Sequence, residues 1–309
     1  MKIKKDLIAI EDVKTEEIFG ILDLAHDVKS DRAKYSASLQ GKSLGLIFQK
    51  PSNRTRVSFE VGMFQLGGHS LYLGPNEIGM GGREATKDVA RVLARYLDGI
   101  VARTYKHEDV KELARYADIP VINGLSDIAH PCQALTDIFT IKEKLGRLKG
   151  VTLAYIGDGN NVLNSLMCAA AKVGLDMKIA TPEGYEPVKS IVAMVKAFAK
   201  QSGSKLEFSN DPRKASVAAD VIYTDVWVSM GQECEAKKRE KAFKDFQVND
   251  NLLKLSKKSC LVMHCLPAHR GLEITDSVID SKVSVVYDQA ENRMHVEKAI
   301  LLKLLGEKA

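Results

Sequence analysis

Residues 151–162 read Val-Thr-Leu-Ala-Tyr-Ile-Gly-Asp-Gly-Asn-Asn-Val, and this stretch decides the fold class. Its first half, Val151 to Ile156, has the length and the aliphatic composition of a buried β-strand. Glycines at 157 and 159 then indicate a tight turn, after which a helix is expected to begin. Strand, glycine turn and helix together form the first part of a βαβ unit.

The same alternation of strand and helix patterns extends along the chain in both directions. Because helical patterns separate the short apolar runs, we expect an α/β protein with parallel sheets. At 309 residues the chain is too long for one ordinary core, so two doubly wound domains of about 150 residues each are predicted. The other predicted strands are Ser43–Phe48, Ser70–Leu73, Gly99–Arg103, Val121–Ile122, Met177–Ala180, Val221–Tyr223, Cys260–His264 and Val283–Tyr287.

The domain boundary is expected between residues 145 and 150. A helix that starts near His130 is predicted to end at Gly146, and a new strand starts after Gly150. Apolar residues recur with helical spacing from Ala290 to Leu305, which predicts a final helix that packs back on the first domain. The predicted parts are therefore residues 1–147, residues 148–289 and a C-terminal helix in residues 290–309.

Composition narrows the classes of function. The chain is 45% hydrophobic and 28% charged, and it shows no apolar run of the roughly 18 residues that a membrane helix needs. Its five cysteines are scattered and include no Cys-x-x-Cys pair, so neither a disulfide framework nor a zinc site is expected. The net charge of +5 is modest, and its densest basic run, residues 237–239, reads as a solvated helix face. We therefore expect a cytoplasmic protein that binds neither nucleic acid nor membranes.

Residues 48–56, Phe-Gln-Lys-Pro-Ser-Asn-Arg-Thr-Arg, form a candidate anion site. They follow a predicted strand and precede a helical pattern, with Ser52 in position to cap the helix. The free N–H groups of the first helical turn and the helix dipole favour an anion there, and Arg54 and Arg56 add positive charge. A capped helix with two exposed arginines is the alternative interpretation.

Two further segments carry polar residues at places suited to an anion. Arg103 ends the strand Gly99–Arg103, and open α/β sheets bind ligands at the carboxyl ends of their strands. His130 precedes a predicted helix, and Gln133 lies three residues further along the same helix face. The alternatives are a strand that merely reaches solvent and a histidine with a structural hydrogen bond.

The remaining candidates lie in the second half of the chain. The turn after Ile156 is not a dinucleotide-binding turn, because the third glycine of that pattern is replaced by Val162. Asp225 follows the predicted strand Val221–Tyr223, and Cys265 follows the strand that ends at His264. A capping aspartate and a small buried apolar cysteine are the alternatives for these two residues.

These motifs together resemble the aspartate/ornithine carbamoyltransferases, and within them the enzymes that use ornithine. Residues 52–56 are similar to the family's Ser-Thr-Arg-Thr-Arg, with Asn53 as the one departure, and residues 130–133 match its His-Pro-x-Gln. Gly-Asp-Gly-Asn-Asn at 157–161, Asp-x-x-x-Ser-Met-Gly at 225–231 and His-Cys-Leu-Pro at 264–267 are similar to further family motifs. Arg293 matches a late arginine. The motifs follow the family's order over essentially the whole chain.

The resemblance implies transfer of the carbamoyl group of carbamoyl phosphate to the δ-amino group of L-ornithine, giving L-citrulline and phosphate in arginine metabolism. It implies contacts to carbamoyl phosphate from Ser52, Asn53, Arg54, Thr55, Arg103, His130, Gln133, Cys265, Leu266 and Arg293. It implies contacts to ornithine from Asn161, Asp225, Ser229 and Met230. The residues expected to take part in catalysis are Arg103, His130, Asp225 and Cys265. No metal or cofactor is expected.

The resemblance further implies a homotrimer or an assembly of trimers, and it leaves some points open. The Gly-rich loop Gly74–Arg83 offers no clear counterpart to the residue by which relatives reach a neighbouring subunit. Another amine acceptor, such as putrescine, lysine or an N-acylated ornithine, is the main alternative. An NAD-dependent oxidoreductase is disfavoured by Val162, and a non-catalytic homologue by the presence of Arg103, His130 and Cys265. Biosynthetic and catabolic enzymes share these residues.

Overall fold

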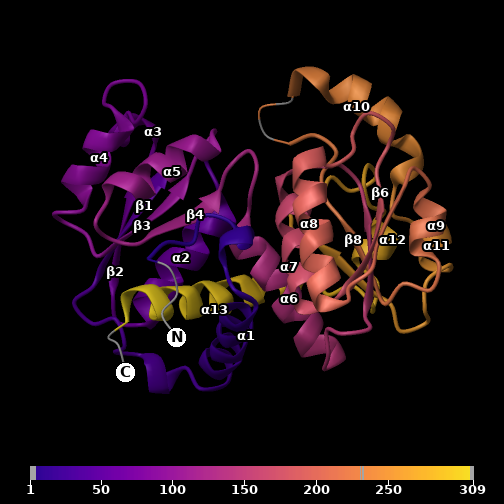
Figure 1. The fold of residues 1–309 in the computed structure, drawn as a ribbon, viewed down its shortest axis with the longest axis horizontal. Helices are drawn as coiled ribbons and strands as arrows, with labels where there is room; N and C mark the ends of the chain where they lie inside the picture. The colour runs from indigo at the N-terminus through magenta and orange to yellow at the C-terminus, as the bar shows by residue number, and fades with distance from the viewer. Residues whose placement is uncertain (1–4, 230, 232, 307–309) are drawn as a thin grey trace. The chain divides into compact units, whose positions relative to one another are not determined.

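The computed structural model describes residues 5–229, 231 and 233–306. The chain divides into two compact units, Met1–Phe139 with Glu291–Ala309, and Thr140–Ala290. Each unit has its own sheet, and all strand pairs in the two sheets are parallel. Helices cover both sheets (Figure 1). The predicted two-domain parallel α/β fold is confirmed. Among the described residues, no helix is both long and apolar enough to cross a membrane.

The first unit contains a four-stranded sheet with the strand order β2-β1-β3-β4. Its hydrophobic core includes the strand residues Ile47 and Ile100 and the helix residue Val110, all of which are fully buried. Its elements are α1 (Thr15–Ser30), β1 (Ser43–Phe48), α2 (Asn53–Gln65), β2 (His69–Leu73), α3 (Pro75–Ile78), α4 (Thr86–Leu93), β3 (Gly99–Arg103), α5 (His107–Tyr116), β4 (Val121–Leu125), the first part of α6 (Pro131–Leu145) and most of α13 (Val286–Leu305), with 3₁₀ turns at Ile10–Asp12 and Ala33–Tyr35.

The second unit contains a five-stranded sheet with the strand order β7-β6-β5-β8-β9. Trp227 is 4% exposed and packs against Phe243, with 5.9 Å between the ring centroids. The elements are β5 (Thr152–Ile156), α7 (Asn161–Val173), β6 (Asp176–Ala180), α8 (Lys189–Ser202), β7 (Leu206–Ser209), α9 (Pro212–Ser216), β8 (Val221–Thr224), α10 (Ala236–Phe243), α11 (Asp250–Leu253), β9 (Leu261–His264) and α12 (Asp276–Ile279), with 3₁₀ turns at Glu233–Glu235 and Lys244–Phe246.

Both sheets reverse their strand order at one point, between β1 and β3 in the first unit and between β5 and β8 in the second. In open α/β sheets such a switch point leaves a crevice at the carboxyl ends of the strands, where ligands bind. The loops after β1, β3, β5 and β8 are therefore the places to look for a site. Each of these four loops contains or directly borders a residue that the sequence selected.

Local sequence explains how two of these loops turn from strand into helix. Ser52 caps α2, its Oγ accepting the N–H of Thr55 at 3.4 Å, and Asn160 caps α7 by accepting from Val162 and Leu163. Gly159 has to be glycine, because a Cβ there would lie 2.5 Å from the carbonyl carbon of Glu186. The glycine thus allows the turn to pass close to a neighbouring backbone.

Three predictions of local structure were wrong. The run Val283–Tyr287 is no strand; Ser284 makes an isolated bridge to Val262, and α13 begins at Val286. Arg293, expected at the start of the final helix, therefore lies well inside it. The edge strand β7 was missed, because its residues 206–209 are half-buried or exposed and do not form an apolar run.

The final helix packs on the first unit through its polar side chains as well as its apolar ones. Lys29 of α1 donates to Asn292 at 2.7 Å, and Lys298 donates to Gln65 at the end of α2 at 3.0 Å. Residues from Glu291 onward belong to the compact unit formed by the N-terminal half of the chain. This packing brings Arg293 to the beginning of α2.

Candidate active site

In the first unit, the predicted contacts to carbamoyl phosphate lie at the beginning of two helices and the end of one strand. Ser52 to Thr55 form the N-cap and first turn of α2, where the N–H groups of the first turn and the helix dipole favour a bound anion. Arg103 is the last residue of β3, and His130 and Gln133 lie at the beginning of α6. Asn53 is exposed, whereas Thr55, Arg103, His130 and Gln133 are buried.

Arg293 joins two of these segments. Its guanidinium donates from Nη2 to Thr55 Oγ1 at 2.7 Å and from Nη1 to Gln133 Oε1 at 3.2 Å. The amide of Gln133 is also fixed at its other end, since Nε2 donates to Asp137 at 2.8 Å. A residue from the far end of the chain thus lies at the centre of the predicted anion site, 238 positions from Thr55.

The cations of this half-site are buried close to one another. Burial, and then the charges of Arg293 and Arg54, lower the pKa of Arg103 to about 9. The Nε of Arg103 is buried and has no hydrogen-bond partner among the described residues. A buried donor without an acceptor is costly, so this arrangement favours binding of an anionic ligand that supplies acceptors.

His130 is kept neutral by the same surroundings. Its complete burial lowers its pKa well below the usual value, and the charges of Arg293, Arg103 and Lys50 act in the same direction. A neutral imidazole carries one N–H, which can donate to a carbonyl oxygen. His130 therefore suits a hydrogen bond to a polarised carbonyl rather than an ion pair.

Sequence reasoning missed Lys50 and overstated Arg56. Lys50 is 7% exposed, lies 5.1 Å from the centre of the Tyr105 ring, and has a pKa lowered by burial and by Arg103. Its position two residues after the end of a buried strand was the available signal. Arg56 is exposed, pairs with Glu60 at 3.0 Å and stacks on Tyr72, so the structure does not bring it into the site.

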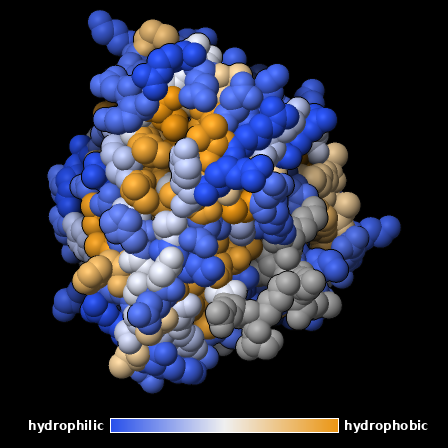
Figure 2. Space-filling view, turned by 90° about the vertical axis from the view of Figure 1, so that its left-hand side faces the viewer, coloured by the Kyte–Doolittle hydropathy of each residue, from blue (hydrophilic) through white to orange (hydrophobic). Residues whose placement is uncertain are grey.

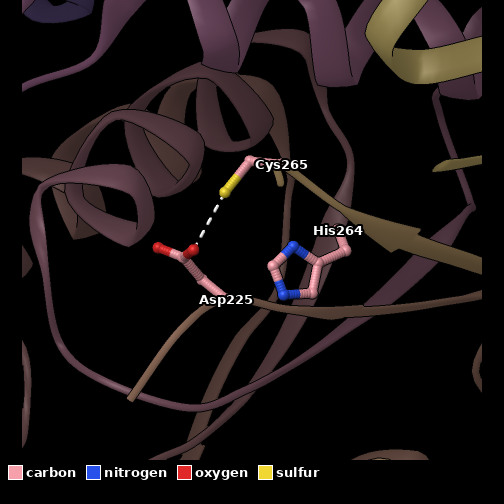
Figure 3. A group of neighbouring side chains, drawn as sticks. All are labelled: Asp225, His264 and Cys265. Carbon is pink, nitrogen blue, oxygen red and sulfur yellow. Dashed lines mark hydrogen bonds between the residues drawn. The ribbon is translucent and has the colours of Figure 1, made fainter. Parts of the chain in front are cut away.

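In the second unit, the central residue of the predicted ornithine site is Asp225, which follows β8. Its Oδ1 accepts from the Sγ of Cys265 at 2.9 Å, and its Oδ2 accepts from the Nδ2 of Asn160 at 2.8 Å. Figure 3 shows the thiol of Cys265 and the carboxylate of Asp225 pointing toward each other, with His264 beside them. The carboxyl ends of β5, β8 and β9 thus place three polar side chains together.

The other predicted contacts of this half-site are placed less directly. Asn161 is the first residue of α7, and it is the preceding residue, Asn160, that bonds Asp225. Ser229 is half-buried in the loop after β8, whereas Met230 lies outside the described residues. The preference of Asn for helix N-caps was the signal that could have selected Asn160.

Leu266 has an uncommon backbone conformation. Its φ of 57° lies in the left-handed region, which a branched side chain rarely adopts. Its N–H donates to Nδ1 of His264 at 2.9 Å. Such strained backbone positions cluster at functional sites.

Sequence reasoning also missed a buried ion pair, which joins α10 to the loop after β5. Arg239 of α10 bonds Asp158 at 3.0 Å and donates to the backbone carbonyl of Trp227 at 2.9 Å. Burial raises the pKa of Asp158 to about 6 although Arg239 acts in the opposite direction. Arg239 thereby ties the loop after β5 to the loop after β8.

Asp225, His264 and Cys265 place three possible metal ligands within 4.8 Å of one another. The hydrogen bonds of His264 test whether they fit a metal. Its Nδ1 accepts the N–H of Leu266, so Nε2 carries the proton that is shared with Glu273 at 3.1 Å. Neither ring nitrogen has a lone pair available, and the group therefore does not fit a metal ion in this arrangement.

Comparison with known families covers both units. The family described as "Aspartate/ornithine carbamoyltransferase, carbamoyl-P binding domain" matches residues 5–143. The family described as "Aspartate/ornithine carbamoyltransferase, Asp/Orn binding domain" matches residues 149–304.

Individual relatives agree with this result. The chain is 55% identical over 304 residues to the "Ornithine carbamoyltransferase, anabolic" of Pyrococcus furiosus, covering 98% of this chain and 96% of the relative. It is 51% identical over 303 residues to the "Ornithine carbamoyltransferase, catabolic" of Thermoplasma acidophilum, covering 98% and 99%. A solved structure of ornithine carbamoyltransferase from Pyrococcus furiosus superposes with a TM-score of 0.95 at 54% identity, covering 98% of each chain.

Proposed function

This chain belongs to the aspartate/ornithine carbamoyltransferase family, and from that premise we propose that it transfers the carbamoyl group of carbamoyl phosphate to the δ-amino group of L-ornithine, giving L-citrulline and phosphate. The observation that carries the proposal is Arg293, which bonds both Thr55 and Gln133 in a buried cluster of cations. Such a cluster suits a small dianion with a carbonyl and an amide.

The first half of the reaction concerns charge. Attack on the carbamoyl carbon places negative charge on the carbonyl oxygen and then on the departing phosphate. We assign the oxyanion to the N–H of His130 and to Arg103, and the carbamoyl amide to Gln133 and the carbonyl of Leu266. Ser52, Asn53, Arg54, Thr55 and Arg293 bind the phosphate. These donors are held in place before the reaction begins, so little reorganisation is needed.

The second half concerns the amine. A δ-ammonium with the pKa of a lysine, about 10.4, is uncharged in only ~1 molecule in 2,500 at pH 7. Asp225 and Cys265 lie together at the end of the second sheet, and we assign them to ornithine and to removal of its proton. Asn161, Ser229 and Met230 complete the α-amino acid contacts. Asn160 holds Asp225 in place.

Parallel assays of the wild-type protein with carbamoyl phosphate and four acceptors test the proposal. Ornithine is expected to give citrulline at a rate that exceeds carbamoylation of putrescine, lysine and aspartate by at least a hundredfold. Preference for putrescine or lysine would overturn ornithine as the proposed acceptor, and the proposal of carbamoyl transfer would stand. Absence of phosphate release with every amine would overturn the reaction itself.

We propose further that residues 1–147 form the domain for carbamoyl phosphate and residues 148–289 the domain for ornithine, with residues 290–309 as the returning helix.

We also propose that the chain forms a homotrimer or an assembly of trimers. In support of this assembly, α2 exposes Val57, Val61 and Phe64 with the spacing of one helix face, and Phe64 is 75% exposed. This helix packs beside the edge strand β2, and Figure 2 shows apolar side chains gathered on that side. Exposed apolar stripes mark interfaces. We expect the native mass of the Phe64→Glu variant to fall to that of one subunit.

We place the reaction in the cytoplasm and in arginine biosynthesis. All five cysteines are described and all are free thiols, which suits a reducing compartment. One similar relative is named anabolic and another catabolic, so similarity alone does not separate the two roles. Kinetics can test whether the chain works in arginine biosynthesis or breakdown. Hyperbolic rate curves against carbamoyl phosphate are expected for the biosynthetic role, and a strongly sigmoidal curve would contradict it.

A further inference from the structure

Glu297 of α13 is a buried acid in the middle of the cationic half-site. Its side chain is 0% exposed, and its Oε1 accepts from the Nε of Arg293, one helical turn earlier, at 2.9 Å. The pair therefore lies almost wholly out of water, since the side chain of Arg293 is 6% exposed. Buried carboxylates are rare unless they are paired.

The bond to Nε determines what the rest of the guanidinium can do. Arg carries its five N–H donors in one rigid plane, so fixing Nε fixes the directions of both terminal nitrogens. One of these reaches Thr55 and the other reaches Gln133. In turn, the contact to Gln133 sets which end of its amide is the carbonyl, because the other end donates to Asp137.

We propose that Glu297 is a positioning residue for this half-site, which holds Arg293 so that its two terminal nitrogens face the phosphate loop and the Gln133 carbonyl. The proposal rests on the proposed function, because it assumes that carbamoyl phosphate binds here. Glu297 touches no substrate itself. It acts through Arg293 and, one bond further, through Gln133.

The charge of Glu297 gives the proposal a second measurable consequence. The groups that act on its carboxyl are Arg293 on its own helix, the Ser58 hydroxyl of α2 and the Cys132 thiol of α6. Burial raises the pKa of the Glu297 carboxyl to about 7, against the lowering influence of Arg293 and Ser58. Cys132 stays neutral, because burial raises its own pKa further above the usual value. An ionised Glu297 partly neutralises Arg293, whereas a protonated Glu297 leaves Arg293 its full charge for a dianion.

Two substitutions separate position from charge. Glu297→Ala removes the acceptor, so the KM for carbamoyl phosphate is expected to rise by about tenfold to a hundredfold, with the KM for ornithine within about twofold of wild type. Glu297→Gln keeps an acceptor oxygen for Nε and removes the charge. The glutamine variant is therefore expected to avoid the rise in the KM for carbamoyl phosphate that the alanine variant shows. Its KM for carbamoyl phosphate should equal that of wild type near pH 6 and fall about threefold or more below it at pH 8.

Glu60→Gln is the matched control. Glu60 makes the same Nε to Oε1 bond with an arginine four residues away, at 3.0 Å, but that pair is partly exposed and lies outside the site. No change in either KM is expected. Thermal unfolding of each variant shows whether it is folded at the assay temperature.

Calorimetric titration of carbamoyl phosphate, without ornithine, keeps the two proposals apart. If the wild type binds carbamoyl phosphate but makes no citrulline, the choice of ornithine fails and the binding data still test Glu297. The positioning role is overturned if the alanine and glutamine variants bind equally, because a lost charge or a loosened fold would then explain both. The pH-dependent effect of the Glu297 charge is overturned if the ratio of wild-type to glutamine-variant affinity is the same at pH 6 and pH 8.

Discussion

The two half-sites of this chain solve opposite electrostatic problems with the same fold. At the switch point of the first sheet, Arg103, Arg293 and Lys50 lie near one another, and burial lowers the pKa of Arg103 and Lys50. At the switch point of the second sheet, the central group is a carboxylate, Asp225, which accepts bonds from a thiol and an amide. The first arrangement favours an anion, and the second favours a cation.

The difference shows what the sheet supplies and what the loops supply. Both sheets provide a crevice at a reversal of strand order, and both place a capped helix beside it. The sign of the charge comes from a few side chains, which lie at strand ends or, like Arg54 and Arg293, on helices. A shared architecture can thus bind two substrates of opposite charge, because function depends on the site and not on the fold.

Removing the oxyanion donor would break the first half-site most severely. His130→Ala is expected to lower kcat by about a hundredfold to a thousandfold, because one preorganised donor to a developing oxyanion contributes that much. The KM for ornithine should change little, since the proposed ornithine contacts belong to the other unit. Steady-state kinetics check the prediction. An unchanged kcat in a folded variant would exclude His130 as the oxyanion donor.

Neutralising the acid would test whether the second half-site depends on its single charge. Asp225→Asn is expected to raise the KM for ornithine about a hundredfold, because a hydrogen bond to an ionised group is lost. Asp220→Asn is a matched control, since Asp220 precedes the same strand and pairs with Lys257 away from the site. Equal losses in the two variants would mean that the effect is structural.

A smaller effect is expected from the neighbouring thiol. Cys265→Ser should lower kcat/KM for ornithine by about tenfold and shift its pH profile, if the pair with Asp225 takes up the δ-proton. Cys260→Ala, at the other end of β9, is the control for loss of a cysteine. A serine variant with the rate and pH dependence of wild type would exclude a role in proton transfer.

The sequence predicted most of what lies at strand ends. Ser52, Arg103, Asp225 and Cys265 each follow or end an apolar run, and the parallel sheets place such residues at the carboxyl ends of the strands. Their expected roles came from the resemblance to the family. The strand β7 was missed for the opposite reason. Edge strands bury little surface, so their apolar pattern is weak.

What the sequence could not predict are the partners across long distances. The bond from Arg293 to Thr55 joins residues 238 positions apart, and no local pattern encodes it. Glu297 looks like an ordinary helix residue until the helix packs on α2. Asn160 and Asn161 differ by one position, and only the turn geometry decides which of them faces Asp225.

The smallest expected effect is on stability, and it concerns Glu297, a buried acid within the cationic half-site. Burial raises the pKa of Glu297 to about 7 from its ordinary value of 4.5, so between these values the native state keeps a proton that the unfolded chain has lost. Its contribution is therefore fully present below about pH 4.5 and is lost as the pH rises through about 7. The loss is at most on the order of 3 kcal/mol. Urea unfolding followed by circular dichroism at pH 5 and pH 8 should show a smaller pH dependence in Glu297→Gln than in wild type, and identical dependence would mean that another group, such as Asp158, carries it.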